Sequence, residues 1–239
     1  PVTVDGVTFP ASAWTVAWPH LSNVLTGAHE LMHALYEAPD LYGYGVGSFD
    51  VMGPTIGGPM WFAPSAWTRM HLGWLTPQVA TRDQWVYFQP SLTNGQASLL
   101  YDPVLRDKGD YFMVEYRRPS VGVYDRDIPQ EGLVIWRADV QAWRAPSATM
   151  RPIELMRSDG TTTPGCSADS CYGGSLGDAW EACRPGYGQR TMNRSWRDGT
   201  PAGVAVRAIG RLPTERGFGT MRAWLDTAGP GILVDTFRC

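Results

Sequence analysis

The sequence has a single lysine, no long apolar run and no cysteine in its first two thirds. Lys108 is that lysine among 239 residues, so arginine supplies nearly all of the positive charge, and the net charge is −3. Because no basic run occurs, we do not expect a nucleic-acid partner. No stretch approaches the roughly 18 apolar residues of a membrane-spanning helix, so no membrane span is expected either.

The four cysteines lie in the last third of the chain, and none belongs to a CxxC motif. An even number of cysteines without zinc-ribbon spacing is typical of disulfides formed in an oxidising compartment, which predicts a secreted protein. We expect Cys166–Cys171 to close a short loop and Cys183–Cys239 to hold the C-terminus, with the other pairings and free buried thiols as alternatives. The start at Pro1, without Met or a signal peptide, predicts a processed or truncated product.

Two helices are predicted in the first third of the chain. Residues 1 to about 20 have alternating apolar positions, typical of extended chain. Apolar residues then recur at spacings of three and four, which predicts a helix from Leu21, with Ser22 or Asn23 as N-cap, to about Tyr36. A second helix is expected over Pro64–Leu72, with proline at its start. Apolar residues make up 44% of the sequence, enough for a sizeable core.

Short β-type runs separated by turn residues dominate the remaining sequence. The runs are Trp85–Phe88, Ala97–Tyr101, Tyr111–Arg117, Leu133–Arg137, Val204–Ile209, Thr220–Leu225 and Ile232–Phe237. They predict an α+β fold in which a helical part, residues 1–80, precedes an antiparallel β-sandwich-like domain, residues 81–239, with a loop-rich insertion at about 159–200. Glu115 and Arg117 alternate with apolar residues on one predicted strand, so we expect a solvent-facing pair.

Residues 29–33 read HELMH, the HExxH motif, and they fall on the first predicted helix. On a helix, positions i and i+4 share one face, so His29 and His33 are predicted to bind the same Zn²⁺ ion. Zinc lowers the pKa of a bound water toward about 7. Glu30, beside the histidines, is predicted to act as the general base that activates this water and then to protonate the leaving amine of a peptide.

A catalytic zinc ion needs a third protein ligand, and no third histidine follows at the spacing HExxHxxGxxH. Three carboxylates follow the motif instead. Asp40 is the favoured ligand because it comes after Pro39, where the chain must turn back toward the helix. Glu37 and Asp50 remain alternatives.

Several segments together resemble the immune inhibitor A-like family of bacterial metallopeptidases (the M6 peptidases), in which HExxHxLGxPDxY recurs. The segments are HELMHALYEAPDLY at 29–42, SFDVMG at 48–53, PSAWTRMHLGWL at 64–75 and YFMVEYR at 111–117. The resemblance implies a secreted bacterial endopeptidase with protein or peptide substrates, one zinc ion and often a structural calcium ion. It places zinc ligands at His29 and His33, the base at Glu30 and, as in metzincin-like enzymes, a methionine turn at Met52.

The sequence departs from the family pattern in two ways. Tyr36 stands where the family has the glycine that ends the helix, and one extra residue separates His33 from Asp40, which predicts a longer helix or a bulged loop. Metzincin-like domains also place a sheet of about a hundred residues before the zinc helix. Only 28 residues precede His29 here, so we expect a partial zinc-helix subdomain without most of that sheet.

Two interpretations other than an active peptidase stay open, an inactive module that binds protein and a module that binds carbohydrate. The chain could be a catalytically inactive or fragmentary β-rich module that binds protein or, as its 11 tryptophans suggest, carbohydrate.

Tyr42 and Tyr44 are candidates to stabilise an oxyanion, although packing is the favoured role for both. Acidic residues in loops, Asp125 and Asp127 among them, are candidates for calcium, with a solvated or turn role favoured. The oligomeric state is not predicted.

Overall fold

The structure is a computed structural model, and it describes about half of the chain. The described residues are 2–4, 6–9, 24–41, 46–53, 61–101, 109–119, 124–139, 152–156, 196, 200–212 and 219–227. Several predictions fall outside them: both disulfides, the helix N-cap, the strand at 232–237, nearly all of the insertion at 159–200, and the roles of Tyr42 and Tyr44.

Two sheets form the body of the described structure, one of five strands and one of three. The five-stranded sheet has the order β3–β5–β6–β7–β8, and it is antiparallel except for the parallel pair β3–β5. Its strands are β3 Gln78–Val79, β5 Ser98–Leu100, β6 Asp110–Arg117, β7 Gly132–Asp139 and β8 Ile153–Leu155. The antiparallel three-stranded sheet has the order β4–β10–β9, from Gln84–Phe88, Thr220–Asp226 and Ala205–Leu212.

Few helices accompany the sheets. They are α1 Val24–Tyr36, the short 3₁₀ turn η2 Gly47–Phe49, α2 Ala66–His71 and α3 Ser91–Asn94. A hairpin of β1 Val2–Val4 and β2 Val7–Phe9 precedes them. The prediction of a mixed, strand-rich fold is confirmed, and neither described sheet closes into a barrel. No described helix has the length and apolar character required to span a membrane.

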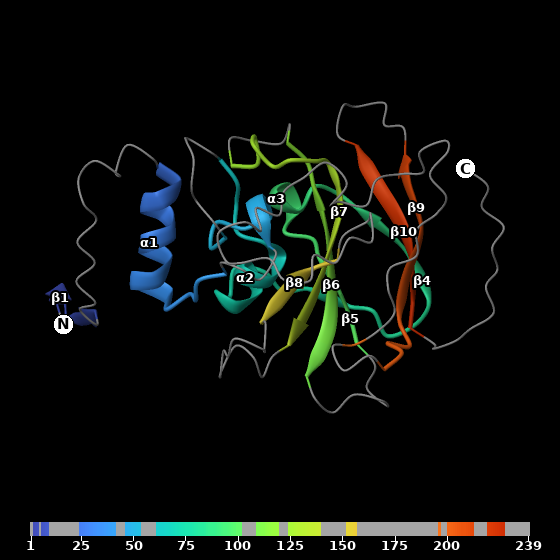
Figure 1. The fold of residues 1–239 in the computed structure, drawn as a ribbon, viewed down its shortest axis with the longest axis horizontal. Coiled ribbons are helices and arrows are strands. Elements are labelled where there is room, and N and C mark those ends of the chain that lie inside the picture. The colour runs from blue at the N-terminus through green and yellow to red at the C-terminus, as the bar shows by residue number, and fades with distance from the viewer. Residues whose placement is uncertain are drawn as a thin grey trace.

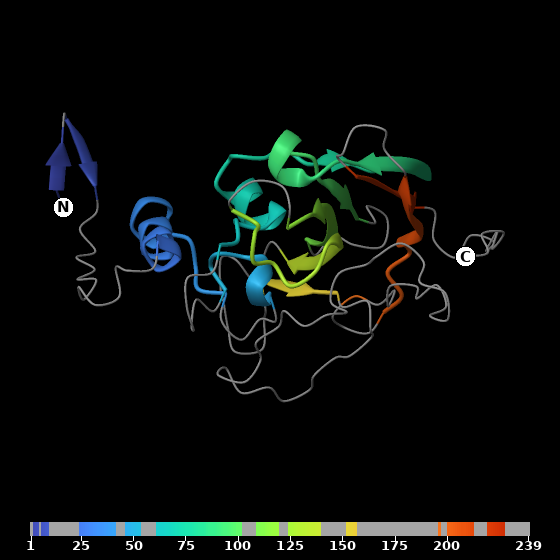
Figure 2. The same ribbon diagram turned by 90° about the horizontal axis from the view of Figure 1, so that it is seen from above.

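The five-stranded sheet is the middle layer of the molecule (Figures 1 and 2). The three-stranded sheet packs on one face of it, where Phe112, Val114 and Ile135 share a core with Phe88 and Leu225. On the opposite face, Met113 and Trp136 pack with the segment before α2 and with α2 itself. This second core also contains Leu25 and Met32 of α1, so it includes residues from both sides of the predicted boundary near residue 80.

Burial on both faces explains why one prediction is wrong. Glu115 and Arg117 were expected to face solvent, but both side chains are 0% exposed. The expectation assumed a strand with one wet face, whereas every residue of β6 is buried. Apolar side chains at both odd and even positions of this strand are typical of a strand covered on two sides.

Candidate metal centre

Helix α1 carries the HExxH motif and presents its first histidine to the interior. Leu25, His29 and Met32 are the buried residues of the helix, and they recur at the spacing of one helical face. His33 lies one turn further along and is partly exposed, as is Glu30. The helix that the sequence predicts is therefore present, and its inward face brings the motif to the edge of the core.

The end of α1 explains how the extra residue in this sequence is accommodated. The helix continues through Tyr36, and Glu37 adopts a left-handed conformation with φ of 53°. Its N–H donates to the carbonyl of His33 at 3.0 Å, and the next N–H, that of Ala38, donates to the carbonyl of Met32 at 3.3 Å, so both bonds close the helix at the left-handed residue. After the turn the chain brings Asp40 back beside the motif.

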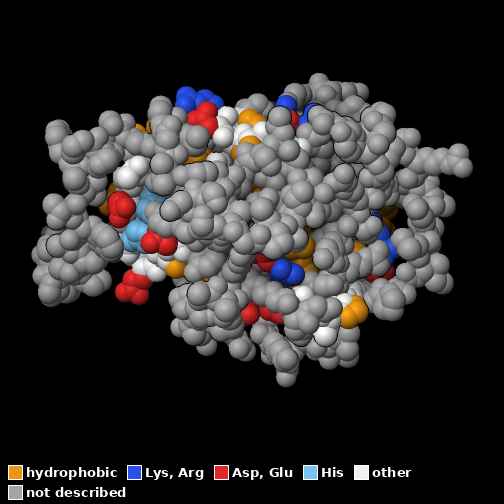
Figure 3. Space-filling view, in the orientation of Figure 1, with side chains coloured by type: hydrophobic (Ala, Val, Ile, Leu, Met, Phe, Trp, Pro, Cys, Tyr) orange, Lys and Arg blue, Asp and Glu red, His pale blue; other side chains and the backbone are white. Residues whose placement is uncertain are grey.

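Three ligand atoms converge at this place. His29 Nε2 and His33 Nε2 lie 3.0 Å apart, and Asp40 Oδ1 lies 3.2 Å from each of them. Within the described ranges, these three residues form the one group of three or more His, Cys, Asp or Glu side chains whose ligand atoms lie within 4.8 Å of one another. Figure 3 shows histidine side chains at the surface beside acidic side chains, on the side of the molecule where α1 lies.

The outer nitrogens of the two rings have backbone partners that decide their protonation. His29 Nδ1 is 2.8 Å from the carbonyl oxygen of Val51, and His33 Nδ1 is 2.5 Å from that of Ala38. A carbonyl oxygen only accepts hydrogen bonds, so each Nδ1 must carry the proton. In the neutral rings both Nε2 atoms then present lone pairs, and these lone pairs face each other and the Asp40 carboxylate. Three acceptors at this separation repel one another unless a proton or a cation lies among them.

The pKa of His29 responds to this arrangement. Burial of the ring is the largest effect and opposes the charged form, but the hydrogen bonds to Asp40 and Val51 outweigh it. The pKa of His29 is therefore raised above its usual value. The surroundings of this ring favour positive charge even though the ring is buried.

The geometry fits a zinc ion. In tetrahedral sites with zinc–ligand distances of about 2.0–2.1 Å, two ligand atoms lie about 3.3–3.4 Å apart. The separations of 3.0–3.2 Å among the three atoms are close to that value. Two imidazoles and one carboxylate are also a ligand set found in catalytic zinc sites, and the backbone bonds at Nδ1 are the usual outer partners of ligating histidines.

The structure places Asp40, and neither Glu37 nor Asp50, in the group with the two histidines. The Asp40 side chain is 52% exposed, with Oδ1 turned to the histidines. Glu37 ends the helix and does not belong to the ligand group. Asp50 is fully buried and accepts hydrogen bonds from the N–H of Met52 at 2.8 Å, the N–H of Ser65 at 3.0 Å and the hydroxyl of Thr68 at 2.6 Å. Burial raises the pKa of Asp50, and the bonds from Ser65 and Thr68 partly offset this.

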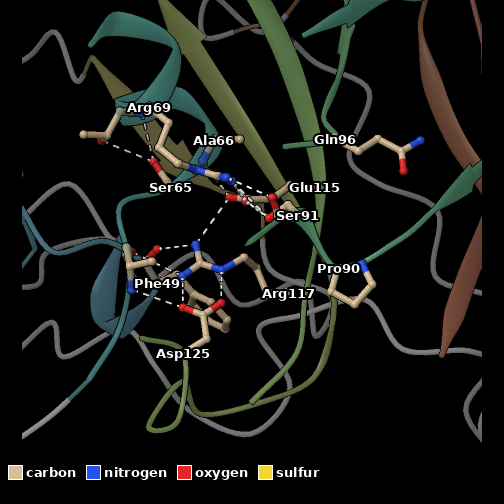
Figure 4. Close-up of polar contacts among 12 residues, drawn as sticks. Phe49, Ser65, Ala66, Arg69, Pro90, Ser91, Gln96, Glu115, Arg117 and Asp125 are labelled. Atoms are coloured by element: carbon tan, nitrogen blue, oxygen red, sulfur yellow. Dashed lines mark hydrogen bonds and ion pairs between the residues drawn. The ribbon is translucent and has the colours of Figure 1, made fainter. Parts of the chain in front are cut away.

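A buried polar network lies between β6 and α2 (Figure 4). Glu115 accepts hydrogen bonds from the Ala66 N–H at 2.9 Å, Arg69 at 2.8 Å, Ser91 at 2.7 Å and the Trp136 indole at 2.9 Å. Burial favours the neutral acid, but the charges of Arg117 and Arg69 outweigh it, so the pKa of Glu115 lies below its usual value.

Arg117 forms the other half of the network. Its Nε and Nη2 donate to the two oxygens of Asp125 at 2.6 and 2.5 Å, a bidentate pair, and Asp125 is itself 1% exposed. The remaining donors reach the carbonyl oxygens of Phe49 at 2.9 Å and Ala63 at 3.2 Å. Both oxygens of Asp125, a calcium candidate in the sequence, therefore accept hydrogen bonds from Arg117. Asp127 accepts from the Trp61 N–H at 2.8 Å.

The sequence contained a signal for this network that the prediction did not use. Residues 111–117 are apolar at both odd and even positions apart from Glu115 and Arg117. A strand of that kind is buried on both faces, and charges on such a strand must be paired. The partner Arg69 lies 46 residues from Glu115, and Asp125 lies in the loop after β6, eight residues from Arg117, so the pattern of the strand itself indicates neither.

Comparison with protein-family models gives no match, and comparison with curated proteins and with solved structures gives none either. The function of the chain has to be argued from the site itself.

The identity of the third ligand can be tested with two matched variants. We expect Asp40→Asn to weaken zinc binding at least about tenfold, because it removes the carboxylate charge from the group. Glu37→Gln removes the same charge three residues away and should bind zinc as the unmodified chain does. Zinc competition with a chromogenic chelator measures both; equal affinity of the two variants would contradict the assignment.

The buried network should matter for stability. We expect Arg117→Met to lower the free energy of unfolding by about 3–5 kcal/mol, because Asp125 remains buried without its cation and Glu115 keeps only Arg69. Arg126→Met removes an exposed arginine that pairs with Asp127 and should cost no more than about 0.5 kcal/mol. Urea unfolding followed by tryptophan fluorescence compares them, and a small loss in Arg117→Met would show that the pairs contribute little.

Proposed function

We propose that this chain is the zinc-binding part of a secreted bacterial endopeptidase related to the immune inhibitor A-like family. In this proposal His29, His33 and Asp40 hold the zinc ion, and Glu30 is the general base for peptide hydrolysis. The observation that carries the proposal is the convergence of two imidazole lone pairs and one carboxylate oxygen within 3.2 Å, with both outer ring nitrogens held by backbone carbonyls.

The placement of Glu30 supports a catalytic rather than a purely structural site. Glu30 follows His29 on α1 and is partly exposed, so its carboxylate is accessible to solvent beside the ligand group. A bound zinc ion would supply Lewis-acid chemistry at this point, acidifying a water molecule and polarising a peptide carbonyl. Glu30 would accept the proton of that water and return it to the amine that leaves.

The half-exposed position of the group supports a macromolecular substrate. Asp40 is half exposed and His33 partly so, and a peptide segment would reach them without entering the core. A metzincin-like arrangement is the finer fold that we propose: Met52, fully buried in the core, would occupy the methionine turn. Calcium, secretion and the cysteine pairings belong to the same proposal, and they rest on the sequence alone.

A second candidate, a β-rich module that binds carbohydrate or protein, has one observation in its favour. Trp85 of β4 and Trp224 of β10 are register partners and alternate with the buried Val86 and Ala223, so they lie on the outer face of the three-stranded sheet. Their rings meet edge to face at 5.6 Å, and Arg222 lies 5.0 Å over the Trp85 ring. Such cross-strand contacts stabilise a sheet without a ligand, and a binding module would leave the His–His–Asp group unexplained.

Replacement of the proposed base separates the two candidates. We expect Glu30→Gln to bind zinc as tightly as the unmodified chain and to lower kcat for casein cleavage about 10²- to 10⁴-fold, because it removes general-base catalysis and keeps the ligands. Glu37→Gln, the same change on an exposed residue outside the ligand group, serves as the control and should cleave normally. Equal cleavage by Glu30→Gln and the unmodified chain, or no zinc bound to either, would rule out the peptidase.

A further inference from the structure

We propose that Asp50 is a positioning residue for the metal centre, acting together with Arg117 through the backbone of residues 49–53. The inference rests on the metal site proposed above, and it concerns how the ligands are held rather than what they do.

The segment 49–53 contacts both chain segments that carry the buried side of the site. The Val51 carbonyl accepts the Nδ1–H of His29 at 2.8 Å, which orients the ring and assigns its tautomer. The next carbonyl, that of Met52, accepts the N–H of Leu41 at 2.8 Å, immediately after Asp40. Two neighbouring carbonyl groups therefore set the positions of two of the three ligands.

Asp50 holds this segment in place at its centre. Oδ1 accepts the N–H of Met52, so the side chain closes the turn on itself. Oδ2 accepts the N–H of Ser65 and the hydroxyl of Thr68, which ties the same turn to the first turn of α2. Since all three bonds are buried, no water can replace a lost partner without a rearrangement of the backbone.

Arg117 holds the segment from the side of the sheet. Its Nη1 donates to the Phe49 carbonyl at 2.9 Å, one residue before Asp50. The guanidinium is fixed by its bidentate pair with Asp125 and by its place on β6, a central strand. Residues 49–53 are therefore attached to the sheet through Arg117 and to α2 through Asp50.

The turn has no room to adjust locally. The N–H of Gly53 donates to the Asp50 carbonyl at 2.9 Å, and a Cβ at position 53 would lie 2.5 Å from the backbone oxygen of Gly47. Val51 and Met52 are buried between these points. A change at Asp50 is accordingly transmitted to the two carbonyls, and from them to His29 and Asp40.

Graded variants test this. Thr68→Val removes one of the three hydrogen bonds to Asp50 and should weaken Co²⁺ binding about three- to tenfold, with a shifted d–d absorption band. Asp50→Asn replaces an acceptor by a donor opposite the Ser65 N–H and should weaken Co²⁺ binding about tenfold or more. Thr68→Ser keeps the hydroxyl and should have the Co²⁺ affinity and the absorption spectrum of the unmodified chain.

The matched control is Thr93→Val, the same substitution at α3, where the lost hydroxyl donates to the Pro90 carbonyl at 2.7 Å. It should leave Co²⁺ affinity and spectrum unchanged. Nitrogen chemical shifts of His29 in the metal-free chain at alkaline pH give a second measurement: the Nδ1–H tautomer should dominate in the unmodified chain and lose population in Thr68→Val and Asp50→Asn.

The outcomes distinguish the inference from the function on which it rests. If the unmodified chain binds Co²⁺ and Asp40→Asn weakens it, while Thr68→Val and Asp50→Asn keep the normal affinity, spectrum and tautomer, the positioning role is overturned and the metal site stands. If Thr68→Val loses thermal stability alone, Asp50 is only structural and the inference fails. If the unmodified chain binds no metal but the tautomer shifts as expected, the proposed function fails and the orienting role of Asp50 is supported.

Discussion

Two imidazole nitrogens and a carboxylate oxygen face one another across 3.0–3.2 Å, because the other polar atoms of the rings are already committed to backbone carbonyls. Neither ring can turn its Nδ1 inward without giving up the bond to Val51 or Ala38. The three lone pairs are therefore held in an arrangement that is unfavourable without positive charge among them. The proposed metal binding and the proposed hydrolysis both depend on that arrangement.

The architecture shows how the arrangement is kept. The five-stranded sheet is covered on both sides, so β6 supplies a rigid, dry support for Glu115 and Arg117. A buried ion pair is a weak source of net stability, because desolvation of the charges offsets much of their attraction. A buried ion pair does, however, hold its two partners in a strict geometry. We interpret this network as a means of locating loop backbone, namely the Phe49 and Ala63 carbonyls and the first N–H of α2, relative to the sheet.

The two alternatives for the proposed third ligand show that closeness in the sequence does not by itself bring a carboxylate to the two histidines. Glu37 is closer in sequence to the histidines than Asp40, but it occupies the left-handed position that ends α1. Asp50 is a fully buried acid whose oxygens are all used within the turn and by α2. Asp40 reaches both histidines at 3.2 Å because the chain reverses after the helix.

Local pattern in the sequence was sufficient to predict the helix around HELMH, α2 with its N-terminal serine, and most of the strands. The reason is that the spacing of apolar residues and the turn residues act over only a few positions. The grouping of Asp40 with the i, i+4 histidines follows from the same short-range geometry. Only the tertiary structure decided which layers cover β6 and which residues, Arg69 and Asp125 among them, pair with the buried Glu115 and Arg117. It also decided that Val51 orients His29 across 22 positions of sequence. Contacts of this kind depend on how separate elements pack, and residue spacing within one element carries no information about them.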